Sequence, residues 1–332
     1  MNVEVSAMAT AAHRRQAPSP PPSTPSTPSA TSRIRVADVL LTVLAPVSWG
    51  TTYVVTTELL PPDRPLLVAA LRALPAGLIL LAFTRRLPTG DWWWKAAVLG
   101  VLNFGAFFPL LFIAAYRLPG GVAATVGSVL PLVVLALSAL VLGTRPTLWS
   151  ALAAIAGVIG VGLMVLTSEA SIDPIGVAAQ VAGVLLIGTA VVLGKRWGRP
   201  AGVSLVALAA WQLTVGGLVL APIALAVEGA PPAISATNAA GFVYLGLFGT
   251  ALAYILWFRG IERLAPAQVS FLGLTNPMAA LIAGFLVLGQ ALTPWQLLGF
   301  LVALGAMAAG QWQPRSARRA EADASRPGGA TA

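Results

Sequence analysis

The sequence predicts an all-α membrane protein whose ten transmembrane helices form two inverted five-helix repeats. Three observations predict this fold class: a strongly apolar composition, an alternation of basic residues along the chain, and a similarity between its two halves. Of the 332 residues, 57% are hydrophobic and 9% are charged, and the mean hydropathy is +0.84. Soluble domains contain about 25% charged residues. A chain this apolar therefore requires a bilayer as its solvent.

Both ends of the chain are expected to be disordered and cytoplasmic. Within the first predicted tail, residues 1–36, the segment from Pro18 to Ser32 consists almost wholly of Pro, Ser, Thr and Ala. Such residues bury too little apolar surface to fold. No apolar core follows a basic start in this tail, which argues against a secretory signal peptide. Residues 313–332 form the second predicted tail, which is basic because it contains four arginines.

Long apolar runs separated by short polar breaks fill the rest of the chain. Each run is close to the ~20 residues that a helix needs to cross about 30 Å of hydrocarbon. In the first half, the predicted helices span 38–59, 65–84, 95–116, 119–142 and 147–167. In the second half, they span 174–194, 203–226, 239–258, 265–288 and 293–312. The breaks contain residues typical of turns, such as Pro61-Pro62-Asp63, Pro119-Gly120-Gly121 and Gly198-Arg199-Pro200.

The basic residues predict how these helices are oriented. With the N-terminus inside and ten crossings, 17 of the 20 basic residues fall on the cytoplasmic side, and only Arg64 and Arg117 fall outside. This bias is the positive-inside pattern of membrane proteins. It places both termini in the cytoplasm and explains the net charge of +9. A nucleic-acid partner is not expected, because the sequence has no Cys/His zinc spacing and no glycine-rich phosphate loop. We therefore expect a multi-pass protein of the cytoplasmic membrane.

The second half of the chain repeats the first at a spacing of 146 residues. Matches of Gly, Pro, Arg and Trp carry the most weight, because Leu and Val match often by chance in an apolar chain. They pair Gly100 with Gly246, Arg117 with Arg263, Gly127 with Gly273, Pro131 with Pro277 and Trp149 with Trp295, and an earlier stretch at a slightly different spacing pairs Gly77 with Gly217. The two repeats cover 38–167 and 174–312. Because five is odd, the second repeat enters the membrane from the opposite side, as in many secondary transporters.

Several short motifs identify a family resemblance. They are Trp49-Gly50-Thr51-Thr52-Tyr53, Leu71-Arg72-Ala73, the run from Tyr244 to Tyr254, Asn276-Pro277, and Leu286-Val287-Leu288-Gly289-Gln290. In this order and spacing, the chain resembles the EamA branch of the drug/metabolite transporter superfamily over about 38–312. It departs from the family pattern at Asn276, Gln290 and Thr144, where the family often has glutamate. These departures weaken any role for those acids in proton coupling.

The resemblance implies a secondary transporter that moves a small organic metabolite, amino-acid-like or drug-like, and favours efflux. It implies alternating access around a cavity lined mainly by the first, third, fourth, sixth, eighth and ninth helices. The expected partners are the small-molecule substrate and the lipid bilayer, with no cofactor and no metal; the oligomeric state stays open, a monomer included. The alternatives are a membrane scaffold without transport activity and, with less support, an intramembrane enzyme. An enzyme is not expected, because the predicted helices contain no His, no Cys and no deep carboxylate.

Arg72 is the only basic residue well inside a predicted helix, and a charge at this depth is usually functional or paired. It could attract a carboxylate or close an outer gate. The alternatives are that its side chain reaches the outer headgroups, or that it pairs with Glu58 or Asp63.

Other candidates are polar or aromatic residues near the middle of helices. Polar groups there are expensive in lipid, so they should face either a cavity or a neighbouring helix. The candidates for lining a substrate cavity, with Arg72, are Trp49, Thr51, Tyr53, Asn103, Phe107, Ser128, Gln180, Trp211, Gln212, Thr250, Tyr254 and Asn276. Pro131 and Pro277 occupy equivalent places in the two repeats and are expected to bend their helices, either near the site or for packing alone.

Overall fold

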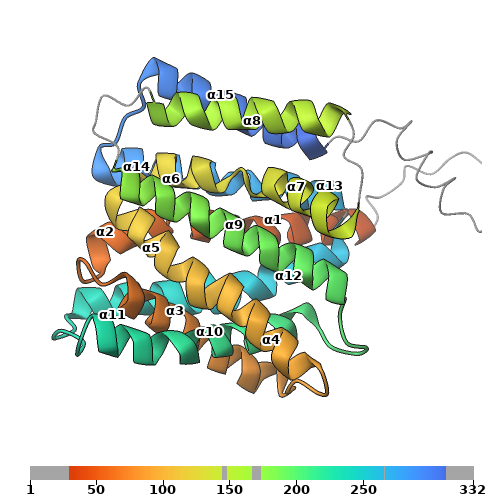
Figure 1. The fold of residues 1–332 in the computed structure, drawn as a ribbon, viewed down its shortest axis with the longest axis vertical. Coiled ribbons are helices and arrows are strands. Elements are labelled where there is room, and N and C mark those ends of the chain that lie inside the picture. The colour runs from red at the N-terminus through yellow and green to blue at the C-terminus, as the bar shows by residue number, and fades with distance from the viewer. Residues whose placement is uncertain (1–29, 144–147, 167–172, 265, 312–332) are drawn as a thin grey trace, which may run out of the picture.

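The computed structural model describes residues 30–143, 148–166, 173–264 and 266–311, and all regular structure in these ranges is helical. The helices lie side by side with their axes roughly along one direction, which is horizontal in Figure 1. The predicted tail 313–332 and residues 1–29 of the other predicted tail lie outside the described residues.

In the described ranges, the first half of the chain forms eight α-helices and one π-helical segment. They are α1 (Ala30–Gly50), α2 (Thr52–Leu59), α3 (Pro65–Thr84), α4 (Trp92–Gly100), η1 (Val101–Ala106), α5 (Phe107–Arg117), α6 (Gly120–Gly127), α7 (Leu130–Leu142) and α8 (Leu148–Leu166). Except at the start of the first helix, these helical stretches begin and end within five residues of the predicted boundaries. Helix α1 begins at Ala30, eight residues before the predicted start at 38 and inside the segment expected to be disordered.

The described part of the second half forms seven α-helices and one π-helical segment. They are α9 (Pro174–Trp197), α10 (Leu205–Val227), α11 (Ala236–Val243), η2 (Tyr244–Leu252), α12 (Ala253–Arg263), α13 (Pro266–Gly273), α14 (Thr275–Leu288) and α15 (Pro294–Gln311). A π-helical segment lies between two α-helices in each half. Sequence reasoning did not anticipate either π segment.

Six helical stretches in the described ranges are long and apolar enough to cross a membrane. They are Pro65–Thr84, Trp92–Arg117, Gly120–Leu142, Pro174–Trp197, Leu205–Val227 and Ala236–Arg263. The helices Val36–Gly50 and Thr52–Leu59 are bent by 44° relative to each other. If this pair is counted as one span, the number of possible spans in the described ranges rises to seven. The apolar helices Ala151–Leu163, Thr275–Leu288 and Pro294–Ala309 are shorter. The fold is therefore that of an all-helical, multi-pass membrane protein.

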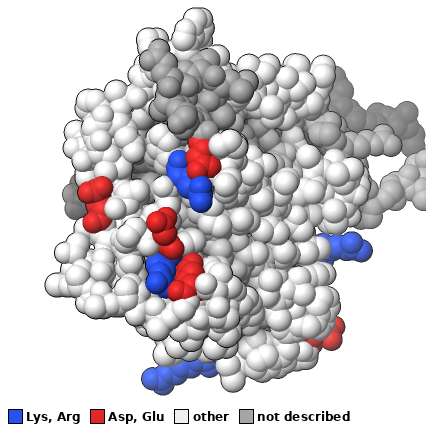
Figure 2. Space-filling model, turned by 60° about the vertical axis from the view of Figure 1, so that its left-hand side comes forward, with Lys and Arg blue, Asp and Glu red and all other residues white. Residues whose placement is uncertain are grey.

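The surface agrees with this conclusion. Large aliphatic side chains are exposed to an extent that water would penalise, among them Leu140 at 81%, Leu148 at 77% and Leu286 at 72%. Figure 2 shows a face on which charged residues are few; near its middle they gather in small groups of both signs, and toward its edges they stand alone. Lipid tails around the helices would cover such a surface at no cost.

Breaks interrupt three of the helical stretches. Thr51 separates α1 from α2, Ser128 and Val129 separate α6 from α7, and Leu274 separates α13 from α14. Pro131 and Pro277 follow the second and third breaks and lie in the first turns of α7 and α14. Because proline lacks a backbone N–H, it fits the first turn of a helix, where that N–H would have no partner within the helix. Each proline therefore lies just after an interruption of its helix.

Glycines allow the closest contacts between helices. A Cβ atom on Gly77 of α3 would lie 2.5 Å from the Thr214 nitrogen of α10, and one on Gly217 of α10 would lie 2.6 Å from Leu74 Cα of α3. Helices α3 and α10 thus pack antiparallel at one edge of the molecule, and α8 packs on α15 at the opposite edge (Figure 1). The main hydrophobic core includes residues of α3 and α10 and of the helices packed against them. Its members include Val68, Ala73, Leu80, Phe104, Phe108, Phe112, Leu213 and Leu245.

Candidate functional site

A cavity of about 880 Å³ lies between the helices, with walls from both halves of the chain. It is referred to below as the central cavity. Its volume falls in the range of pockets that bind small organic molecules. The buried side chains of Tyr53, Arg72 and Gln180 form its deep part. Its lining continues to the exposed residues Lys195 and Arg199, where α9 ends, so the cavity reaches the surface at that end of the molecule.

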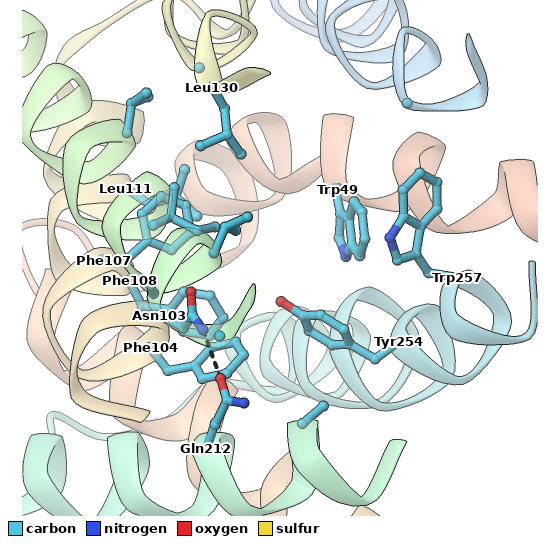
Figure 3. Close-up of a pocket in the computed structure, with 18 of the residues that line it drawn as sticks. Trp49, Asn103, Phe104, Phe107, Phe108, Leu111, Leu130, Gln212, Tyr254 and Trp257 are labelled. Carbon is cyan, nitrogen blue, oxygen red and sulfur yellow. Dashed lines mark hydrogen bonds between the residues drawn. The ribbon is translucent and has the colours of Figure 1, made fainter. Parts of the chain in front are cut away.

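Aromatic side chains form one wall of the central cavity (Figure 3). The Trp49 ring lies 5.5 Å from Tyr254 and 5.4 Å from Trp257, measured between ring centroids. Phe104 meets Tyr254 edge to face at 5.8 Å. Phe107 lies across the cavity, on α5. Such tilted and edge-to-face arrangements are favourable for π-systems. They leave flat apolar surfaces exposed to the cavity.

Arg72 projects from α3 into the deep part of the cavity and is only 3% exposed. Its Nε donates to Thr250 Oγ1 at 2.9 Å, and its Nη2 donates to the Gly249 carbonyl at 3.2 Å. The guanidinium carbon lies 4.7 Å from the centroid of the Phe108 ring. Its Nη1 has no hydrogen-bond partner. In the described part of the chain, no ion pair joins Arg72 to Glu58 or Asp63, so the pairing considered from the sequence is not seen.

The π-helical segment η2 supports this arrangement. Its Gly249 carbonyl accepts hydrogen bonds from both Arg72 and the Trp49 indole nitrogen, the latter at 3.0 Å. Its Thr250 hydroxyl accepts from Arg72 and donates to the Leu245 carbonyl, five residues earlier. π-Helical turns are rare and occur frequently at functional sites. Here the turn provides two oxygen atoms that hold a cationic side chain in place.

Amide side chains supply the other polar groups. Asn103 Nδ2 donates to Gln212 Oε1 at 2.7 Å, which links η1 to α10 (Figure 3). Gln180 Oε1 and Asn276 Oδ1 are buried and have no hydrogen-bond partner in the described part of the chain. Both residues line the cavity, so these two oxygens are free to accept hydrogen bonds from a bound molecule.

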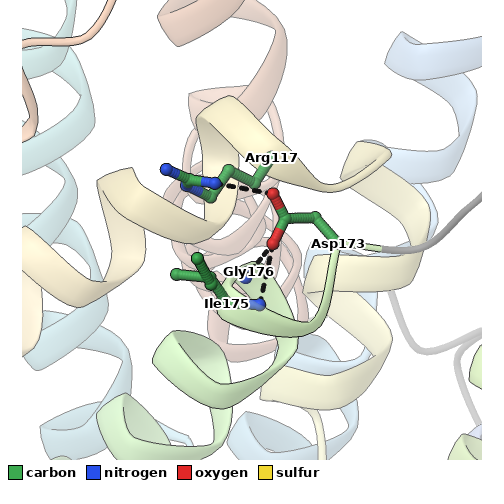
Figure 4. Close-up of polar contacts among 4 residues, drawn as sticks. All are labelled: Arg117, Asp173, Ile175 and Gly176. Carbon is green, nitrogen blue, oxygen red and sulfur yellow. Dashed lines mark hydrogen bonds and ion pairs between the residues drawn. The ribbon is translucent and has the colours of Figure 1, made fainter.

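Polar contacts join the helices at the end of the molecule away from Lys195. Arg117 Nη1 lies 2.6 Å from Asp173 Oδ2 and links the end of α5 to the start of α9 (Figure 4). Asp173 Oδ1 accepts from the backbone nitrogens of Ile175 and Gly176 and so caps α9. The hydrogen bond from Arg117 holds the pKa of the Asp173 carboxyl below its usual value. Nearby, Tyr116 donates to the Pro61 carbonyl at 2.7 Å.

Comparison with known proteins identifies the family. The sequence matches the EamA-like transporter family over residues 37–166 and again over 174–309. The chain belongs to the EamA-like transporter family. It is therefore a transporter rather than an enzyme, as the sequence predicts. The family resemblance inferred from the short motifs is confirmed.

The sequence of this EamA-like transporter is similar to those of several known proteins, among them one described as a transporter and one described as an exporter. PecM of Dickeya dadantii is 47% identical over 264 residues, which cover 79% of this chain and 88% of PecM. The uncharacterized inner membrane transporter YedA of Escherichia coli (strain K12) is 30% identical over 266 residues, or 76% of this chain and 84% of YedA. A probable terminal-alkyne amino-acid exporter of Streptantibioticus cattleyicolor is 29% identical over 209 residues, or 61% of this chain and 68% of the exporter.

A solved crystal structure has the same fold as this EamA-like transporter. The two superpose with a TM-score of 0.61 at 19% sequence identity, over 86% of this chain and 99% of the other. At this identity the similarity establishes the fold and nothing about substrates.

Ten of the residues proposed from the sequence line the central cavity of this EamA-like transporter. They are Trp49, Tyr53, Arg72, Asn103, Phe107, Ser128, Gln180, Gln212, Tyr254 and Asn276, and both prolines, Pro131 and Pro277, line it as well. Sequence reasoning did not select Phe104, Phe108, Trp257, Lys195 and Arg199, which also line it. Helical spacing could have found some of them, because Phe108 follows Phe104 by four residues and Trp257 follows Tyr254 by three.

Three proposed residues lie outside the cavity lining. Thr51 Oγ1 is hydrogen-bonded to the Tyr244 hydroxyl at 2.7 Å, and its neighbour Thr52 lines the cavity instead. Trp211 is buried, and its indole nitrogen donates to the Arg86 carbonyl at 2.6 Å. Thr250 lies behind Arg72 and holds the guanidinium group.

Proposed function

We propose that this protein is a secondary transporter that exports a small organic metabolite, amino-acid-like or drug-like, across the cytoplasmic membrane by alternating access. The observation that carries the proposal is the central cavity, in which aromatic rings and a few buried polar groups from both halves of the chain converge. Pockets of this composition bind small molecules. The family establishes transport, and one relative is described as a probable amino-acid exporter.

We further propose that ten helices span the membrane as two inverted five-helix repeats, over 38–167 and 174–312. Reciprocal contacts between equivalent residues support this. Gly77 and Gly217 are equivalent by sequence, and each faces the helix that carries the other. At the opposite edge, a Cβ on Gly160 would lie 2.6 Å from the Ala303 nitrogen, and one on Gly157 would lie 3.6 Å from Ala306 Cβ. A two-fold axis in the membrane plane produces such paired contacts.

Two ion pairs support the same symmetry. Arg117 and Arg263 are equivalent by the 146-residue spacing. Arg117 pairs with Asp173 at the start of α9, and Arg263 lies 3.5 Å from Asp38 in α1, which also pairs with Arg259 at 2.7 Å. Equivalent arginines thus contact the first helix of the opposite repeat, one at each end of the molecule. In the proposed orientation, the Arg117 end is outside and the Arg263 end is cytoplasmic.

This orientation suggests which state the structure represents. The cavity reaches the surface beside Lys195 and Arg199, at the end that the positive-inside rule assigns to the cytoplasm. Contacts between Arg117 and Asp173 and between Tyr116 and Pro61 hold the other end together. We therefore interpret the structure as open toward the cytoplasm, the state in which an exporter would take up its substrate.

The experiment compares metabolites in the medium and cytosol of cells with and without this protein, followed by counterflow of each accumulated compound in proteoliposomes. Export predicts a compound that builds up in the cytosol without the protein and exchanges across liposomes only when it is present. A membrane scaffold, the competing reading, predicts no counterflow for any compound in a broad panel, and that result would reject the proposal.

A further inference from the structure

We infer that the central cavity selects an organic anion, a molecule with a flat conjugated body and an acidic group such as a carboxylate, and that Arg72 binds the acidic group. This inference rests on the proposed transport function and names the substrate class for the same cavity. It is carried by the charges, the unpaired atoms and the aromatic wall of the cavity.

Every charged side chain among the described residues that line the cavity is basic. They are Arg72 in the deep part, and Lys195 and Arg199 at the mouth, and no Asp or Glu is among them. Glu262 lies beside the mouth, 3.8 Å from Arg199, but its side chain is 53% exposed and outside the lining. A cavity with charges of one sign raises the local concentration of molecules with the opposite sign. The lining therefore favours anions and disfavours amines.

Arg72 is a cation that forms no ion pair with any acidic side chain among the described residues. Its contacts are with the neutral oxygens of Thr250 and Gly249 and with the faces of Phe108 and Phe112. Removing a charged group from water is costly unless it is paired. The side chain is 3% exposed, and its Nη1 has no partner among the described residues, so the two N–H groups of Nη1 are left for a ligand. A carboxylate placed against Nη1 would complete this set with a charge-assisted hydrogen bond.

The surroundings of Arg72 favour an organic anion over an inorganic one. The rings of Trp49, Tyr254 and Trp257 form a surface on which a flat conjugated system can stack. The buried oxygens of Gln180 and Asn276 have no partners and can accept from an N–H or O–H group of the same molecule. Neither chloride nor phosphate has a flat apolar body that could stack on these rings.

Three probes with one aromatic body test this inference: indole-3-acetate, indole-3-acetamide and tryptamine, which are anionic, neutral and cationic. Binding to the purified full-length protein raises its Tm, and the size of the rise reports affinity. We expect the acid to bind with a Kd roughly tenfold lower than that of the amide or the amine. Equal or tighter binding of the amide or the amine would overturn the inference, as would no shift with the acid at about 10 mM.

Substitutions test which residues cause the preference for the acid. Arg72→Gln should abolish the preference for the acid, and Arg72→Lys should retain part of it. Because Arg72→Gln risks misfolding, Lys195→Gln provides a second test at the exposed mouth. It should lower the rate of acid counterflow several-fold at low salt and much less at high salt, since exposed charges are screened. Arg196→Gln is the matched control, because Arg196 is the next residue of α9, is exposed and does not line the cavity. An equal effect of Lys195→Gln and Arg196→Gln would contradict the inference.

The same measurements separate this inference from the transport proposal. If cells export a compound but the protein binds the amine as well as the acid, the anion selectivity is wrong and the transport function stands. If the acid binds selectively but no compound moves across proteoliposomes, the transport function is wrong and the anion site stands.

Discussion

Trp49 makes polar and aromatic contacts in the cavity wall at the same time. Its indole nitrogen donates to Gly249, and its ring packs against Tyr254 and Trp257. Trp49→Ala removes a ring of the cavity wall on which a substrate could stack, so we predict that substrate counterflow falls by at least roughly tenfold. Leu286→Ala, at a side chain that is 72% exposed, is the control and should leave counterflow unchanged. Equal rates for the two variants would remove Trp49 from the site.

A substitution of Asn276 is expected to change function and stability in different directions. Its Oδ1 atom is buried in the cavity wall without a partner, and such an atom costs about 1–3 kcal/mol. Asn276→Leu, of similar volume, relieves that cost, so we predict a Tm equal to or above that of the parent protein together with loss of counterflow. A lower Tm with normal counterflow would indicate that the amide has a packing role only.

The residue types that form the site could be predicted from the sequence more reliably than the direction in which each side chain points. Thr51 and Thr52 are adjacent, yet only Thr52 lines the cavity, because consecutive residues of a helix point about 100° apart. A boundary error of one residue is therefore enough to choose the wrong one. Trp211 and Thr250 have the residue types expected of a cavity wall, but both make hydrogen bonds within the protein instead. Trp211 donates to the Arg86 carbonyl and Thr250 accepts from Arg72, contacts that depend on how the helices pack.

At the scale of elements, the contact between α3 and α10 depends on glycine. A Cβ on Gly77 would lie 2.5 Å from a backbone nitrogen of α10, so one of the two helices must move to admit it. We predict that Gly77→Ala lowers the free energy of unfolding by about 1–3 kcal/mol, measured as a drop in Tm in detergent. Gly162→Ala in α8 is the matched control, because nothing lies within 4 Å of the added atom. Similar losses in the two variants would mean that the contact is looser than described.

The ion pair between α5 and α9 gives a pH-dependent prediction. Because Arg117 lowers the pKa of Asp173, the stabilisation that this pair provides is present above the unfolded pKa of about 3.9 and is lost as the pH falls through the lower folded value. Asp173→Asn keeps a good helix cap but removes the charge. We predict that the Tm difference between parent and variant is constant near neutral pH and shrinks below pH ~4. A difference that does not change with pH would exclude the ion pair as its cause.

The positions of helices were predictable, and their internal breaks were not. A span needs a continuous apolar run, so composition and length locate it to within a few residues. The breaks at Thr51 and Leu274 and the π turns of η1 and η2 arise from local backbone hydrogen bonding, which leaves little trace in hydropathy. Pro131 and Pro277 follow two of the breaks, but Pro75 and Pro222 lie inside continuous helices, so proline alone does not locate a break.

At the scale of the whole molecule, orientation is the feature on which the rest of the mechanism depends. If Lys195 faces the cytoplasm, the cavity loads from inside; if it faces outward, the same cavity would serve uptake. The chain contains no cysteine, so single cysteines report their own location without background. Ala201 and Ala230 are exposed residues in the loops that precede and follow α10, at opposite ends of the molecule.

We predict that a membrane-impermeant maleimide labels Ala230→Cys in intact cells and labels Ala201→Cys only after the membrane is opened. The reason is the positive-inside bias, because Lys195 and Arg196 in the last turn of α9 and Arg199 in the following loop lie at the same end of α10 as Ala201. Labelling after denaturation is the control that each cysteine is present. The reverse labelling pattern would mean that the protein has the opposite orientation and that the cavity opens outward. Labelling of both sites in intact cells would mean that α10 does not cross the membrane.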